Sequence, residues 1–228
     1  MGIGEKTLLL VSGSREMSVL TGTSQAQVLS PDKGYTVKKV SSSNTFIVKR
    51  GNRYTEIKHV LELVENPLDL EKIHDSIPSS SIWNLLPPVD VQGCFYLGDS
   101  QIELVEKELK LLKLSGGYAK INYKDMADVA CYISSVKECS DFGIKMDIYP
   151  EIVKEWALRN FTGDPAEVAL HCLLACDEGG NMEIFLKSWE EMHLDEVNIG
   201  DLTQRVNSTF IPQKKKERLQ QYLNKLTG

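Results

Sequence analysis

Residues 148–192 read IYPEIVKEWALRNFTGDPAEVALHCLLACDEGGNMEIFLKSWEEM, and this stretch predicts three consecutive helices. Each segment carries large apolar side chains at a spacing of three and four residues, which places them on one helical face. Two of the chain's three tryptophans, Trp156 and Trp189, lie on these faces. We therefore expect the stretch to form the core of the main domain.

Capping residues mark the ends of these predicted helices. Pro150 opens the first helix, at a position where a missing N–H costs nothing. Asp164 is expected to cap the second helix ahead of Pro165, because a carboxylate can accept the free N–H groups of a first turn. Gly179 and Gly180 are expected to end that helix.

Residues 7–50, near the start of the chain, favour short β-strands joined by turns. Apolar and β-branched runs alternate there with turn residues such as the segment 30–34, SPDKG. Residues 35–42 and 44–51 are expected to pair with each other. Connections this short favour antiparallel pairing, because a parallel crossover needs about a dozen residues or more. The sequence therefore predicts a small meander.

A helix is predicted to support this sheet. The apolar residues of segment 53–66 recur at helical spacing, and residues 68–75 indicate a second, shorter helix. The apolar face of the first helix would consist of Ile57, Val60, Leu61 and Val64.

A segment rich in proline and serine, residues 77–98, follows, and it contains the apolar run Ile82–Leu86. This composition suits a strap between a β-rich domain at 1–76 and a helical domain at 99–228. The apolar run either docks one part onto the other or binds a protein partner. The candidate partner-binding residues are Trp83, Leu85 and Leu86.

The remaining sequence predicts helices. One covers residues 99–117, with two glycines at its end, and another covers 122–139, where Asn122 and Asp125 stand in a capping relation. Further helical patterns occupy residues 198–208 and 212–226.

The expected fold class is therefore α+β, because strands come first and helices after them. It consists of an N-terminal antiparallel β meander with one or two helices, followed by a C-terminal multi-helix bundle. The chain has 228 residues, of which 42% are hydrophobic and 25% charged, a composition typical of globular proteins. Without a long apolar run or a secretory leader, it is expected in the cytoplasm, with the nucleus as an alternative.

The net charge of −6 is unevenly distributed. Residues 1–66 hold nine Lys and Arg against six Asp and Glu, whereas the remainder holds 17 against 26. Tyr35, Phe46 and Tyr54 lie among the cations, a pattern typical of surfaces that bind single-stranded nucleic acid. A solvated sheet face whose lysines discourage edge-to-edge pairing is the alternative. The candidate anion-binding residues here are Lys38, Lys39, Lys49, Arg50 and Arg53.

A second basic cluster opens the last predicted helix, where the helix dipole disfavours cations. This placement favours an anionic partner, either nucleic acid or an anionic membrane surface, although a solvated helix end is the simpler interpretation. The candidate residues are Lys214, Lys215 and Lys216.

The turn Gly13–Arg15 follows an apolar run and resembles in outline the phosphate-binding opening of Rossmann-like domains. Such domains need a helix after the turn, whereas residues 17–22 favour a strand, and neither glycine-rich phosphate-binding motif occurs. A nucleotide-binding enzyme or regulator at this turn is one alternative function.

The five cysteines form no CxxC pair, and we expect buried thiols rather than metal ligands. His171 and Cys172 are adjacent on a predicted helix and point about 100° apart, so they cannot pair as base and nucleophile. No catalytic residue, metal or cofactor is predicted, and an enzyme is the less favoured class.

The expected function is that of a non-enzymatic binding or assembly protein that self-associates and contacts an anionic partner. The architecture, rather than any motif, is similar to that of viral matrix-type and nucleocapsid-associated structural proteins. A protein–protein adaptor that presents the strap around Trp83 is a further alternative.

Overall fold

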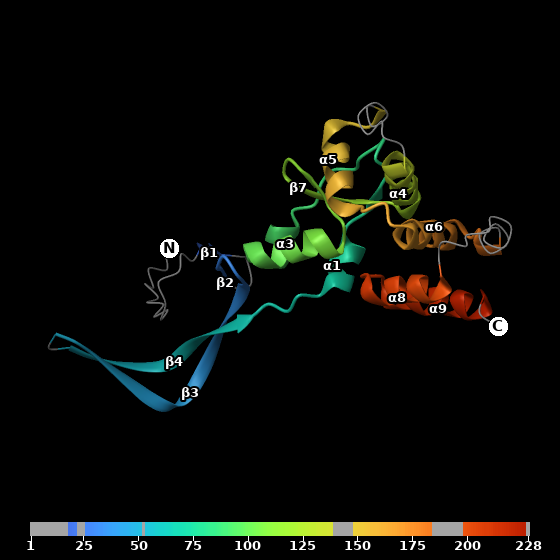
Figure 1. The fold of residues 1–228 in the computed structure, drawn as a ribbon. Helices are drawn as coiled ribbons and strands as arrows, with labels where there is room; N and C mark the ends of the chain where they lie inside the picture. The colour runs from blue at the N-terminus through green and yellow to red at the C-terminus, as the bar shows by residue number, and fades with distance from the viewer. Residues whose placement is uncertain (1–17, 22–25, 52, 139–147, 184–197, 227–228) are drawn as a thin grey trace. The chain divides into compact units, whose positions relative to one another are not determined.

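The computed structural model describes residues 18–21, 26–51, 53–138, 148–183 and 198–226 (Figure 1). The fold is α+β, with an antiparallel strand meander near the N-terminus and a mostly helical remainder, as the sequence predicted. Contacts within the chain divide it into a smaller unit, Met1–Leu68 with Val91–Glu103, and a larger unit, Asp69–Asp90 with Leu104–Gly228.

The predicted boundaries at residues 76 and 98 stay predictions. In the structure, residues 77–90 of the predicted strap belong to the larger unit, and residues 91–98 belong to the smaller one.

The smaller unit contains a four-stranded sheet in the order β1-β2-β3-β4, with every pair antiparallel. Its helical residues belong to α2 and to the start of α3. The bounds are β1 (Ser18–Thr21), β2 (Ala26–Leu29), β3 (Gly34–Arg50), β4 (Arg53–Glu65), α2 (Val91–Phe95) and α3 (Asp99–Glu108).

The helix predicted for residues 53–66 is wrong, because these residues form strand β4. Their apolar residues fit a two-residue period as well as a helical one, since Ile57, Leu61 and Leu63 alternate along a strand. The strand period prevails because β4 pairs with β3 from Glu65 to Arg53. A long partner strand satisfies the backbone groups that a helix would have satisfied internally.

The two strands predicted at 35–42 and 44–51 do not pair with each other but form the single strand β3. The register shifts between Ser41 and Phe46, where β3 holds extra residues opposite β4. The sequence SSSN at 41–44 contains no glycine or proline to reverse the chain, so the irregularity is absorbed as a bulge. Figure 1 shows β3 and β4 as one long, paired ribbon.

Two glycines let segments of the smaller unit approach closely. A Cβ on Gly34 would lie 1.6 Å from the carbonyl oxygen of Tyr96, and one on Gly98 would lie 2.3 Å from the backbone nitrogen of Lys33. The Gln101 side chain joins the same segments, because its Oε1 accepts hydrogen bonds from the N–H groups of Gly34 and Gly98.

The larger unit combines a three-stranded sheet, ordered β5-β7-β6, with helices. Strand β5 runs parallel to β7, and β6 runs antiparallel to it. The bounds are α1 (Leu70–Ser76), β5 (Ser79–Ser80), β6 (Leu112–Leu114), β7 (Gly117–Ile121), α4 (Tyr123–Glu138), α5 (Glu151–Asn160), α6 (Pro165–Gly179), α8 (Ile199–Ser208) and α9 (Gln213–Leu226).

The caps predicted for α6 and for the start of α4 are confirmed, whereas Pro150 is the N-cap of α5 rather than its first residue. The Asp164 carboxylate accepts the N–H of Ala166, Pro165 is the first residue of α6, and Gly180 ends the helix in a left-handed conformation. The N–H of Asp125 donates to Asn122 Oδ1 at 2.8 Å. The helix predicted for residues 181–192 lies mostly outside the described residues.

The helix predicted for residues 99–117 is wrong beyond residue 108. Helix α3 ends at Glu108, and residues 112–121 form the β6–β7 hairpin. Ser115 and Gly116 form the hairpin turn and Gly117 begins β7; both glycines have positive φ angles, and neither ends a helix. A Cβ on Gly117 would lie 2.3 Å from the Val89 carbonyl oxygen, so glycine is needed there for close approach as well.

Two hydrophobic clusters form the core of the larger unit. One packs α4 and α5 against the small sheet and includes Trp156, Ile133 and Ile121. The other packs α6, α8 and α9 together around Leu173, Leu202 and Leu219. Trp156 is 4% exposed, which agrees with the core role predicted for its helix.

Candidate functional site

The five cations predicted in the N-terminal part all lie on the β3–β4 ribbon. Lys38 and Lys39 are exposed on β3. Lys49 and Arg50 end β3, and Arg53 begins β4.

The strand register separates these cations into two sets, because successive strand residues alternate between faces. Cross-strand pairs join Lys39 to Leu61 and Arg50 to Arg53, and these pairs belong to the same face as the pair of Phe46 with Ile57. We call this the cationic face. Apart from Glu65, which accepts a 2.7 Å hydrogen bond from Lys33, the described strand residues on this face include no acid.

The opposite face of the ribbon carries acids among its lysines. There Lys38 pairs in register with Glu62, Lys49 pairs with Tyr54, and Lys58 and Glu56 follow on the same side of β4. Two carboxylates offset two of the three lysines, which makes this face the weaker candidate for binding an anion.

The pair Arg50–Arg53 sets two like charges directly across from each other at the end of the ribbon, beside Gly51. Like charges in register destabilise a strand pair. This pairing is visible only once the register is known.

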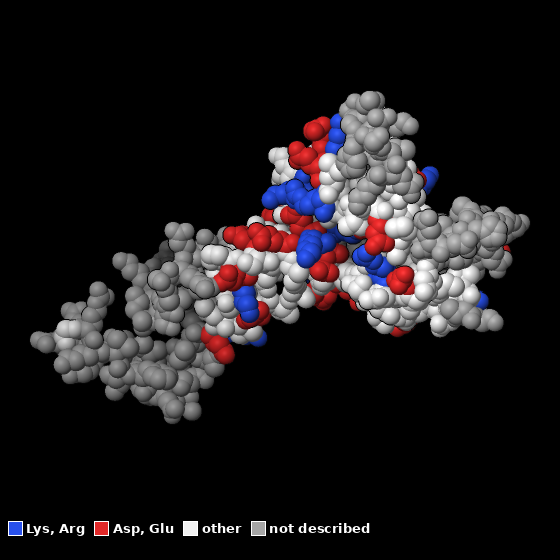
Figure 2. Space-filling view, in the orientation of Figure 1, with Lys and Arg blue, Asp and Glu red and all other residues white. Residues whose placement is uncertain are grey.

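The lysines of the second predicted basic cluster have different surroundings and do not form one exposed patch. Lys214 is exposed, but the Lys215 ammonium lies 4.1 Å from the centre of the Tyr123 ring, and Lys216 donates to the carbonyl of Asn207 at 3.0 Å. Figure 2 shows basic side chains next to acidic ones over the larger unit on this face, without one extended basic patch.

The strap residues dock on the larger unit through Ile82, which is 3% exposed and donates its N–H to Asp125 Oδ2 at 2.8 Å. Leu85 packs partly against the same core. Trp83 remains 61% exposed and Leu86 39% exposed. The Trp83 ring stacks on Tyr149 with a centroid distance of 5.3 Å. The turn Gly13–Arg15 lies outside the described residues.

A network around Lys110, which sequence reasoning missed, forms a second polar centre in the larger unit. The Lys110 ammonium donates to Glu167 Oε1 and to the carbonyl of Asn160, both at 2.7 Å. It also lies 4.3 Å from the centre of the Phe161 ring. The Lys110 carbonyl accepts the indole N–H of Trp156 at 2.9 Å.

Burial would raise the pKa of Glu167, but the Lys110 ammonium and the hydrogen bonds from Thr162 lower it on balance. Burial lowers the pKa of Lys110, against the attraction of Glu167. His171 stands beside the pair, with its Nε2 atom 3.4 Å from the Lys110 ammonium. Burial, and then the Lys110 charge, lower the pKa of His171 to about 3.

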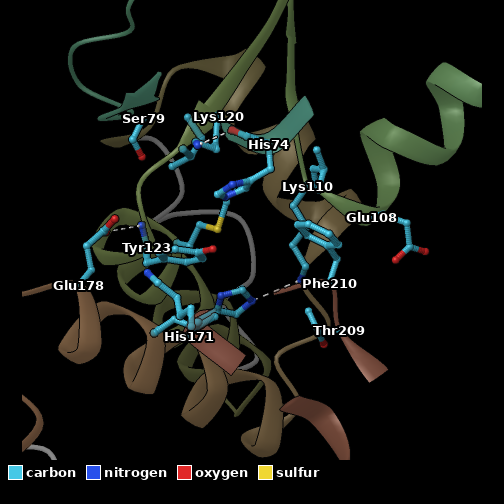
Figure 3. A pocket seen from close by; sticks show the side chains of 15 residues that line it. His74, Ser79, Glu108, Lys110, Lys120, Tyr123, His171, Glu178, Thr209 and Phe210 are labelled. Carbon is cyan, nitrogen blue, oxygen red and sulfur yellow. Dashed lines mark hydrogen bonds between the residues drawn. The ribbon is translucent and has the colours of Figure 1, made fainter. Parts of the chain in front are cut away.

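A cavity of about 130 Å³ lies next to this network, entirely within the larger unit. Figure 3 shows the rings of His74, Tyr123, His171 and Phe210 gathered around it. They come from α1, α4, α6 and the segment between α8 and α9, which are far apart in the sequence. Lys120 and Lys215 also line the cavity.

The expectation of buried cysteines is wrong for Cys94 and Cys131, which are exposed, while Cys172 and Cys176 are half-buried. The sulfur atoms of Cys131 and Cys172 lie 3.7 Å apart between α4 and α6. Their hydrogen bond lowers the pKa of Cys131 to about 7. In the described part of the chain, no three His, Cys, Asp or Glu side chains are placed to share a metal ion.

Comparison of the chain with protein-family models, curated proteins and solved structures finds no match. Among the described helices, none is long and apolar enough to cross a membrane.

The Lys110–Glu167 pair is expected to control the stability of the larger unit. Lys110→Met leaves the Glu167 carboxylate buried and unpaired, which should lower the free energy of unfolding by about 3–5 kcal/mol. Adding Glu167→Gln should recover part of this loss, because the neutral amide still accepts the Thr162 hydrogen bonds. Urea unfolding followed by tryptophan fluorescence measures both changes. A loss below about 1 kcal/mol for Lys110→Met would contradict this role, since it falls within the range of surface pairs.

Stability is also expected to fall in mild acid because of His171. An unfolded histidine has a pKa of about 6.5, so between that value and its lower folded pKa the unfolded chain binds the extra proton. The His171 contribution is therefore complete above about pH 6.5 and decreases by about 1.4 kcal/mol for each pH unit below it.

Urea unfolding of the wild type and His171→Leu at pH 7.5 and 5.5 measures this dependence. The wild type should lose more stability than the variant between these values. The pKa of His74 is also lowered by burial, so the variant should retain part of the dependence. Equal losses in both proteins would show that His171 is not held neutral.

Proposed function

We propose that this protein is a non-enzymatic binding and assembly protein whose β3–β4 ribbon contacts single-stranded nucleic acid. The observation that carries the proposal is the register, which gathers Lys39, Arg50 and Arg53 on one face of the ribbon. Cations at these positions would contact phosphates, and this electrostatic term supplies most of the affinity in sequence-independent binding.

The aromatic residue on the same face favours nucleic acid over an anionic membrane. Phe46 lies in register with Ile57, between Lys39 and Arg50 along β3. An aromatic side chain between cations allows a base to stack while the phosphates are neutralised. Proteins that bind a membrane surface commonly use an amphipathic helix, whereas the cations here lie on a pair of strands. Binding to anionic vesicles is thus the competing outcome of the test.

The first experiment compares two neutralised ribbons that carry the same change in charge. Lys39→Gln/Arg50→Gln/Arg53→Gln alters the cationic face, and Lys38→Gln/Lys49→Gln/Lys58→Gln alters the opposite face. Fluorescence anisotropy with a labelled single-stranded oligonucleotide at several salt concentrations gives the affinity and its salt dependence. The first variant should reduce the slope of log K against log salt by about 2, because each lost phosphate contact removes about 0.7.

The variant of the opposite face should change the slope much less. The cationic-face variant also removes the Arg50–Arg53 repulsion, so a loss of binding would not result from a weakened hairpin. Equal losses of oligonucleotide affinity in both variants would contradict the proposal, because they would show that binding depends only on the net charge. Binding of the wild type to vesicles containing phosphatidylserine, but not to the oligonucleotide, would replace nucleic acid with a membrane surface.

We propose the exposed Trp83 as the contact for a protein partner, with a second copy of the chain as the first candidate. An indole that is 61% exposed and already stacked on Tyr149 forms a rigid, flat apolar surface. Tryptophan is enriched among the residues that dominate binding energy in protein interfaces. This surface supports both the self-associating function and the adaptor alternative.

Sedimentation velocity over a range of protein concentrations tests Trp83 directly. The wild type should form a concentration-dependent oligomer that Trp83→Ala weakens by about tenfold or more in Kd, as expected for a central interface residue. Leu158→Ala is the matched control, because Leu158 is 53% exposed on α5 and is not assigned to this surface. If the two variants associate equally, Trp83 is not the self-association contact.

A further inference from the structure

The cavity of the larger unit is not used by the proposed nucleic-acid surface, and it has the size of a small ring. Its volume is about 130 Å³. An apolar protein cavity of about 150 Å³ is known to hold one benzene molecule. The aromatic rings in Figure 3 and the side chains of Met126 and Leu174 provide a largely apolar lining. A single planar ring therefore fits the space.

Two of the lysines that line the cavity, Lys120 and Lys215, are partly buried beside it. Lys120 donates to the carbonyl of His74 at 2.7 Å, and no carboxylate of the described residues lies within 4.0 Å of its Nζ atom. Burial lowers the pKa of Lys120, although the charges of Asp75 and Glu178 oppose that effect. Burial lowers the pKa of Lys215 as well, although Glu178 and Asp177 oppose that effect. An anion beside these groups would offset the cost of burying their charges.

His171 contributes a buried polar atom that has no partner in the protein. Its side chain is 2% exposed, and its Nδ1 atom makes no hydrogen bond. Because Nε2 faces the Lys110 ammonium, Nε2 is the acceptor and Nδ1 carries the proton. A buried N–H without an acceptor costs free energy, so an acceptor atom on a ligand would stabilise the site.

The acids of the lining restrict the charge of the ligand. Glu108 and Glu178 both line the cavity, and the Glu178 Oε2 atom accepts the N–H of Tyr123 at 3.4 Å. These carboxylates, together with that of Asp177 at 3.8 Å from the Lys215 ammonium, oppose the entry of a doubly charged phosphate. A singly charged group is more compatible with this balance.

We propose that this cavity binds a small monocyclic aromatic carboxylate, with its ring among Tyr123, Phe210 and His74 and its carboxylate toward Lys120 and Lys215. The ligand class follows from the volume, the surrounding rings, the Lys120 ammonium, which has no carboxylate partner among the described residues, and the unpartnered Nδ1 atom of His171. The site would be separate from the cationic face, so its occupancy can be measured without nucleic acid.

Benzoate is the probe, with benzyl alcohol as its uncharged analogue and phenyl phosphate as its dianionic analogue. Titrations of the 15N-labelled full chain, followed by proton–nitrogen correlation spectra, report which amide groups respond. Benzoate should shift the amides of His74, Lys120, Tyr123 and Phe210 in a saturable way, with a Kd of about 1 mM or lower. Benzyl alcohol and phenyl phosphate should bind at least about tenfold more weakly.

Lys120→Met is expected to weaken benzoate at least about tenfold and leave benzyl alcohol unchanged, because only the charged contact is lost. Lys113→Met is the matched control, since Lys113 is exposed on the neighbouring strand β6. Absence of saturable shifts at about 20 mM benzoate would overturn the proposal. Equal binding of benzoate and benzyl alcohol to the wild type would also overturn it, and this comparison does not depend on any variant folding.

Discussion

The buried ion pair between Lys110 and Glu167 is the interaction on which the larger unit depends. Lys110 follows the end of α3 in a left-handed conformation, with φ of 48°. From this position its ammonium reaches α6, and its carbonyl accepts the Trp156 indole of α5. One residue thus joins three helical segments that are distant in the sequence. Breaking such a pair leaves an uncompensated charge, so both partners are needed together.

The same network shapes the cavity beside it. His171 is held neutral by burial and by the Lys110 charge, and its Nε2 atom is oriented toward that charge. This orientation leaves Nδ1 as the unpartnered donor of the site. The polar network and the proposed ligand site are therefore linked, because the pair that stabilises the fold also fixes the tautomer of a cavity residue.

The sequence predicted helices and strands best where a local signal fitted only one kind of secondary structure. The Asp164 cap, Pro165 and Gly180 delimit α6 through contacts within a few residues, so its ends were predictable. Segment 53–66 fitted both a helix and a strand, and only pairing with β3 decided between them. Gly116 and Gly117 could end a helix or form a hairpin turn, and the turn became clear from the strand pairing.

For the candidate sites, the sequence showed at most which residue types were present and not how they are arranged. Lys39, Arg50 and Arg53 were identified as cations, but the register that places them on one face depends on a bulge and on a strand that the sequence did not reveal. The cavity was missed altogether. Its residues come from seven helices and strands and from the segments between them, and they carry no common spacing, so no pattern in the sequence could join them.

Size-exclusion chromatography with light scattering, and with absorbance at 260 and 280 nm, tests the central claim most directly. The protein should be purified without nuclease and run at low and high salt. We predict a mass above that of one chain at low salt, with co-eluting absorbance at 260 nm that is lost at high salt as counterions compete for phosphates. A monomer free of nucleic acid at every salt concentration would contradict the account.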